Sequence, residues 1–166
     1  MDFNTAVAEQ TPRLRRYARA LTRNAVAADD LVQDCLERAL ARWRQFKPNT
    51  DLRAWLFTIM HNLHIDALRR DKMTTVSLDE IGDPIATPPA QEPTIRIRDL
   101  AVALDQLPAE QREVVLLVGL EGMSYKAVAE VLAVPIGTVM SRLARGRDRL
   151  RILIDEPGAP ALRRVK

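Results

Sequence analysis

Residues 124–149 of this 166-residue chain read SYKAVAEVLAVPIGTVMSRLARGRDR. Ser124 is a good helix cap, and Pro135 interrupts the helical pattern that follows it. We therefore predict a short helix over 125–132, a turn of about three residues, and a longer helix from 136 to about 153. Two helices joined in this way form the helix-turn-helix pattern of many DNA-binding proteins.

The longer predicted helix has two different faces. Its apolar stripe consists of Ile136, Val139, Leu143 and Leu150. Its polar, basic edge consists of Thr138, Ser141, Arg142, Arg145 and Arg149. Guanidinium groups fit guanine edges and phosphates, and hydroxyl groups suit either. The pattern favours a helix that reads DNA in the major groove; a solvated arginine face on an ordinary bundle helix is the alternative.

The rest of the chain also shows helical spacing of apolar residues. In the first half, stripes are predicted at Leu14, Tyr17 and Leu21; at Val32, Cys35, Leu36, Ala39, Leu40 and Trp43; and at Leu52, Trp55, Leu56, Ile59, Leu63 and Ala67. In the second half, residues 96–106 and a segment starting at Pro108 are also predicted to be helical. No segment alternates with period two for long, so we expect an all-α protein.

Proline and charge divide the chain into parts. Four of the ten prolines fall within 76–95, a segment of net charge −4 between blocks of +4 and +3. We therefore expect a helical domain over 1–75, a linker over 76–95, a helix-turn-helix domain over 96–155, and a frayed tail over 156–166. As an extended chain the linker would reach roughly 60 Å. Whether the two domains pack together stays open.

Several classes of protein are disfavoured. No apolar run approaches the length of a membrane span, and the N-terminus does not resemble a signal peptide. The lone Cys35 has no disulfide partner, so a reducing cytoplasm is expected. Nucleophile elbows, phosphate-binding glycine loops and paired catalytic carboxylates are missing from the sequence, so we expect neither an enzyme nor a cofactor. His61 and His64 have the spacing of two metal ligands, but the sequence places no third, which disfavours a metalloenzyme.

Two further surfaces have binding potential. The segment 29–44 is acidic at its start and basic at its end, which suits a protein-docking helix, although the helix dipole alone favours the same order. The loop 46–51 precedes a helix that carries Asn62, Asp66 and Arg69 on one face. Polar groups beside aromatic residues in this arrangement could hold single-stranded bases.

These segments resemble regions 2 and 4 of bacterial sigma factors. The likeness to region 2 lies in DDLVQDCLERAL (29–40), LRAWLFTI (52–59) and NLHIDALRR (62–70). The likeness to region 4 lies in LPAEQREV (107–114), MSYKAVAE (123–130) and PIGTVMSRLARGR (135–147). The whole chain is similar to the short two-domain group, the extracytoplasmic-function sigma factors.

The resemblance implies binding to core RNA polymerase and to promoter DNA, and control by an anti-sigma factor is common in the family. The polymerase-docking residues would be Asp30, Gln33, Asp34, Glu37 and Arg38. The residues reading the melted −10 element would be Lys47, Asn49, Thr50, Asp51, Asn62, Asp66 and Arg69. The basic edge that begins at Thr138 would read the −35 element.

The chain departs from the family at three positions: Met140 replaces a common basic residue, Ala133 a common glycine, and His61 a frequent arginine. Two other functions remain alternatives. One is a conventional helix-turn-helix regulator that binds duplex DNA alone. The other is a sigma-like decoy that binds a sigma antagonist.

Overall fold

The computed structural model describes residues 1–74 and 95–155, and within these ranges every regular element is helical. The all-α prediction is therefore confirmed. The predicted linker and tail lie outside the described residues, apart from Ile95, which begins a helix. Within the described ranges no single helix is long and apolar enough to cross a membrane. Only the last two helices, taken together across a 105° bend, meet that requirement of length and composition.

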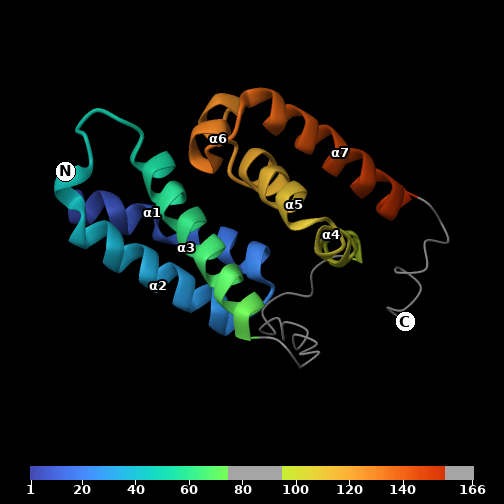
Figure 1. Cartoon of the computed structure of the whole chain (residues 1–166), viewed down its shortest axis with the longest axis horizontal. Coiled ribbons are helices and arrows are strands. Elements are labelled where there is room, and N and C mark those ends of the chain that lie inside the picture. The colour runs from blue at the N-terminus through green and yellow to red at the C-terminus, as the bar shows by residue number, and fades with distance from the viewer. Residues whose placement is uncertain (75–94, 156–166) are drawn as a thin grey trace.

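Three helices form the N-terminal body (Figure 1). They are α1 (Phe3–Thr22), α2 (Ala25–Ala41) and α3 (Leu52–Thr74), with a short 3₁₀ turn, η1 (Trp43–Gln45), after α2. Asp2 caps α1 by accepting from the Thr5 amide at 2.7 Å, and Asn24 caps α2 by accepting from the Ala27 amide at 3.0 Å. Both caps satisfy amides that a helix start leaves unpaired.

The predicted stripe of α2 is wrong at its C-terminal end. Leu40 is 45% exposed and Trp43 is 52% exposed. The α-helix ends at Ala41, and the chain then tightens into η1. The spacing that would have placed Trp43 on the buried face is therefore lost. The earlier members of the stripe behave as predicted, and Cys35 is fully buried. Burial raises the pKa of the Cys35 thiol to about 12, so this group stays protonated.

The C-terminal body contains α4 (Ile95–Asp105), α5 (Ala109–Val115), η2 (Leu116–Leu120), α6 (Tyr125–Leu132) and α7 (Ile136–Asp155). The apolar run after Pro108 begins as α5 and widens into the π-helical turn η2. The Arg112 guanidinium joins α5 to the end of α4, because it donates to the backbone oxygens of Leu104, Asp105 and Leu107 at 2.9–3.0 Å.

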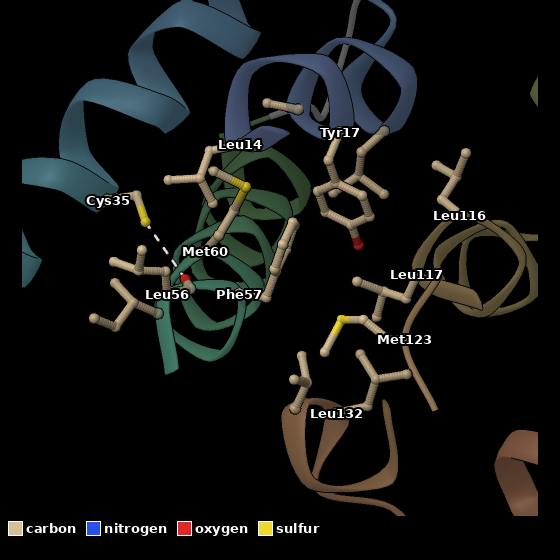
Figure 2. Close-up of a cluster of buried hydrophobic side chains, with 14 of the residues drawn as sticks. Leu14, Tyr17, Cys35, Leu56, Phe57, Met60, Leu116, Leu117, Met123 and Leu132 are labelled. Carbon is tan, nitrogen blue, oxygen red and sulfur yellow. Dashed lines mark hydrogen bonds between the residues drawn. The ribbon is translucent and has the colours of Figure 1, made fainter. Parts of the chain in front are cut away.

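The two bodies pack against each other and share one apolar core (Figure 2). Tyr17 of α1 and Phe57 of α3 meet edge to face, with ring centroids 5.0 Å apart. Leu117 and Met123 of the C-terminal body face them and are equally buried. Because α3 is buried on two sides, Phe57 and Met60 belong to the core although the sequence stripe omitted them. The open question of domain arrangement is thus answered by a compact structure.

Candidate nucleic-acid interface

Helices α6 and α7 form the predicted helix-turn-helix, with an angle of 105° between them. The Ser124 hydroxyl accepts from the Ala127 amide at 3.1 Å and so begins α6. Ala133 ends α6 in the left-handed region, with φ +53°, and its amide donates to the Glu130 carbonyl. Glycine is favoured in this conformation. The turn nevertheless forms in the expected place with alanine at this position.

Helix α7 packs through the predicted stripe except at its first residue. Val139, Leu143 and Leu150 are buried, whereas Ile136 is 49% exposed and was wrongly assigned to the stripe. Ile136 opens the helix immediately after the turn, before the contact with α5 begins. That contact is close, because a Cβ added at Gly146 would lie 2.7 Å from the Val115 side chain.

The basic edge of α7 is mostly open to solvent. Ser141, Arg145 and Arg149 are exposed, and Thr138 is half-buried. The Ser141 hydroxyl donates to the Thr138 carbonyl at 3.1 Å. Arg142 is partly covered and lies 3.6 Å from the Glu110 carboxylate. All five predicted residues thus come together along one helix, with Arg142 in a weak surface ion pair.

The loop between η1 and α3 is held in a defined turn. The Thr50 amide and hydroxyl both donate to the Lys47 carbonyl, at 3.3 Å and 2.7 Å, and Asn49 between them has φ +66°. The Asp51 carboxylate caps α3 by accepting from the Ala54 amide at 3.2 Å. Thr50 and Asp51 therefore shape the loop through their side chains, while Lys47 and Asn49 take part through their backbone and are exposed.

An aromatic cluster packs at the start of this loop. Phe46 lies 5.4 Å from Trp55 and 5.8 Å from Phe3, measured between ring centroids. Phe3 and Trp55 complete the cluster at 6.1 Å. All three rings are half-buried. The N-terminus of α1 thus packs against residues at both ends of the loop through Phe3. The spacing of residues within 46–70 had not indicated this contact.

The exposed face of α3 carries the other predicted base-reading residues. Asn62, Asp66 and Arg69 are all exposed, even with the two bodies packed together. His61, one position away, is turned to a different neighbour and forms a short contact with the Glu113 carboxylate of α5. This contact joins the two bodies and is not the metal arrangement considered from the sequence.

The predicted protein-docking face lies on α2. Asp30, Gln33, Asp34 and Glu37 are exposed, Arg38 is half-buried, and the Gln33 amide donates to the Glu37 carboxylate at 3.1 Å. A groove of about 510 Å³ runs between this face and α1. Its lining combines apolar and charged side chains: Arg15, Arg19, Asp29, Val32, Gln33, Leu36, Glu37 and Leu40.

The contact between the bodies contains charged groups that the sequence did not single out. Arg16 of α1 contacts the Glu121 carboxylate at 3.0 Å, and the Glu121 side chain is fully buried. The Arg53 guanidinium donates to the Glu121 carbonyl at 2.9 Å. Arg23 pairs with Asp105 at the end of α4. Burial raises the pKa of Tyr17, and the nearby carboxylates of Glu113 and Glu121 raise it further.

Comparisons with known proteins agree with this two-part architecture. Residues 7–61 match the family described as the Sigma2 domain of PhyR, and residues 97–150 match Sigma-70 region 4. The ECF RNA polymerase sigma factor EcfG of Rhodopseudomonas palustris is 39% identical, with 89% of this chain and 82% of that protein covered. CarQ of Myxococcus xanthus, an RNA polymerase sigma factor, is 31% identical, with 93% and 90% covered.

Solved structures show the same likeness. The sigma factor RpoE of Bartonella quintana, in complex with the anti-sigma factor NepR, matches with a TM-score of 0.83 at 34% identity, covering 95% of this chain and 99% of RpoE. CnrH, in complex with the cytosolic domain of CnrY, matches with a TM-score of 0.68 at 27% identity, covering 94% and 89%. The fold and the helix-turn-helix define a two-domain transcription factor. The chain belongs to the extracytoplasmic-function (ECF) family of RNA polymerase sigma factors.

Proposed function

We propose that this sigma factor binds core RNA polymerase through α2 and directs it to promoters through two separate DNA-reading surfaces. The observation that carries the proposal is that both surfaces are already formed and exposed on one chain. Lys47 and Asn49 project from a hydrogen-bonded loop, and Arg145 and Arg149 line the second helix of a helix-turn-helix. The chain reads DNA and leaves the covalent chemistry to the polymerase.

Each surface suits a different form of DNA. Helix α7 fits the major groove of a duplex, where guanidinium and hydroxyl groups distinguish base edges. We assign the −35 element to it. The loop 47–51 and the exposed face of α3 offer polar groups beside aromatic rings, which suits unpaired bases. We assign the melted −10 element to them.

The partners follow from this role. The face of α2 carries both acidic and basic side chains, and it lies beside a groove whose lining includes Val32, Leu36 and Leu40. This combination suits docking to a polymerase subunit. We also propose that an anti-sigma protein holds this chain inactive, because the similar sigma factor RpoE is seen in complex with the anti-sigma factor NepR. The polymerase partner places the activity in the bacterial cytoplasm, and a stress or envelope-response regulon fits the family.

Run-off transcription with purified core polymerase tests the proposal. A pool of promoter fragments is transcribed with and without the protein. We expect new, discrete start sites only with the protein. Tight duplex binding by the free protein, without new starts, would instead indicate a conventional regulator. Neither starts nor DNA binding would indicate a sigma-like decoy.

A further inference from the structure

The ion pairs that join the two bodies all have the same polarity. The N-terminal body supplies the basic side chains, which are Arg16 of α1, Arg23 directly after α1, and His61 of α3. The C-terminal body supplies the carboxylates. Arg53 of α3 adds a fourth basic group, since it donates to the backbone oxygen of Glu121. The contact therefore sets basic side chains of one body against acidic side chains of the other, while the side chains of Arg16 and Arg23 remain 53% and 49% exposed.

The basic surface of the N-terminal body extends along α1 beyond the residues that contact the other body. A shallow hollow of about 480 Å³ on α1 is lined by Ala8, Thr11, Pro12, Arg15, Arg16 and Arg19. No acidic side chain lines it. Arg16 lines this hollow and also pairs with Glu121, so the arginines of the hollow and those of the contact form one continuous strip. A surface of one sign attracts polyanions.

The strip also adjoins the residues proposed to read the −10 element. Arg53 follows Asp51 of the loop by two positions, whereas His61, although next to Asn62 in sequence, faces Glu113 of the C-terminal body. A DNA strand held by the loop would therefore have its phosphates close to the Arg53 end of the strip. Because phosphate contacts supply most of the affinity of DNA-binding proteins, cations in this place would strengthen binding to any sequence.

One acidic group of this contact lacks part of its hydrogen bonding. One carboxylate oxygen of Glu121, Oε2, is buried without a partner among the described residues. A buried carboxylate with an unsatisfied oxygen costs free energy, and a buried ion pair adds little stability by itself. The contact between the bodies is thus suited to being replaced by another anion.

We infer that Arg16, Arg23, Arg53 and His61 form a phosphate-binding strip for promoter DNA. In the compact state this strip is occupied by carboxylates of the C-terminal body and, at Arg53, by the Glu121 carbonyl. The inference relies on the proposed function only for the identity of the anion. In the compact protein, Glu113 and Glu121 take the place of phosphates. When the bodies separate, the strip becomes available to DNA.

Two double variants test this occupancy, because both break the Arg16–Glu121 ion pair. Glu113→Gln/Glu121→Gln removes the occupying charges and keeps the strip. Arg16→Gln/Arg53→Gln also breaks this ion pair but removes two of the strip's arginines. A third, Glu130→Gln/Asp155→Asn, matches the charge change of the first at two exposed acids away from the contact. Circular dichroism checks the fold, and small-angle X-ray scattering reports the separation of the bodies.

The probe is a fluorescent single-stranded oligonucleotide of random sequence, about 20 nucleotides long, titrated with each full-length protein. We expect the Glu113/Glu121 variant to bind about tenfold tighter than wild type, with a salt dependence steeper by about 0.7 for each cation freed. The other two variants should show no such gain. Equal gains in the Glu113/Glu121 and Arg16/Arg53 variants would overturn the inference, because opening alone would then explain the effect.

No gain in the Glu113/Glu121 variant, or an equal gain in the Glu130/Asp155 control, would overturn it as well. The probe carries no promoter sequence and the assay contains no polymerase. A negative result here therefore leaves the run-off test of sigma activity unaffected, and the two proposals fail independently.

Discussion

The arginines of the two bodies are used in different ways. In the N-terminal body, Arg16 and Arg23 pair with carboxylates of the other body, and Arg53 donates to one of its backbone oxygens. In α7, Arg145 and Arg149 are exposed, and Arg142 has only a weak surface contact. The comparison shows that the basic edge of the helix-turn-helix stays open to solvent in the compact structure, while part of the basic surface of the N-terminal body is paired with the other body.

The largest expected effect concerns the core beneath that occupied surface. Phe57→Ala removes a fully buried ring that packs on Tyr17 beside the contact between the bodies. We expect a loss of about 3–5 kcal/mol in the free energy of unfolding. Urea denaturation measures it. Trp43→Ala is the matched control, since its ring is 52% exposed and its loss should stay within about 0.5 kcal/mol. Similar losses for the two variants would contradict the described core.

The next effect concerns the free arginines of α7. Arg145→Ala should weaken binding to a duplex carrying the −35 element by about 1–3 kcal/mol if the guanidinium reads a base. Competition against a scrambled duplex measures the specificity. Arg151→Ala, on the same helix but outside the proposed reading edge, should lower affinity for both duplexes to a similar, smaller extent. Equal loss on both duplexes for Arg145→Ala would reduce its role to phosphate binding.

A smaller effect, a gain in the free energy of unfolding, is expected at the turn that connects α6 to α7. Ala133 has φ +53°, a conformation that costs a residue with a Cβ about 1–2 kcal/mol. Ala133→Gly relieves this strain but adds chain entropy to the unfolded state. We therefore expect a net stabilisation of about 1 kcal/mol or less, measured by thermal unfolding. A lowered melting temperature would show that Ala133 is not strained in this turn.

The smallest effect is a pH dependence centred on His64. Burial lowers the pKa of His64 below its ordinary value of 6.5; Glu113 opposes this shift, and His61 and Arg112 add to it. The unfolded chain thus takes up a proton more readily than the folded one. Stability contributed by neutral His64 is present above pH 6.5 and is lost progressively as the pH falls from that value through the lower pKa of the folded state.

Unfolding free energies at pH 7.5 and 5.5 measure this dependence. The His64→Gln variant should lose less stability between these two pH values than the wild type does. An equal or larger loss in the variant would assign the pH dependence to other groups.

Local signals were sufficient to predict most of the helices. The Ser124 cap, the Pro135 break and the stripe of α7 located the helix-turn-helix, because each depends on neighbours in sequence. The errors have local causes too: the helix ends before Trp43, and Ile136 precedes the packed part of α7. Phe57, Met60, Glu113 and Glu121 were missed because their burial depends on contact between segments far apart in the sequence, which periodicity does not report.

The candidate site divides in the same way. Within each of α2, α3 and α7, the residues of the predicted face lie side by side as the spacing indicated, since each face belongs to a single helix. The support of the loop by Phe3 and the pairing of Arg16 with Glu121 connect distant residues and could be found only in the folded structure.

Promoter selection with two single variants tests the central claim, that one chain carries two separate DNA readers. Core polymerase with wild type, Asn49→Ala or Arg145→Ala transcribes a pool of randomised promoters, and the active sequences are read. The account predicts that Asn49→Ala relaxes base preference only in the downstream element, and Arg145→Ala only in the upstream element. Relaxation of the same element by both variants, or of neither element, would contradict it.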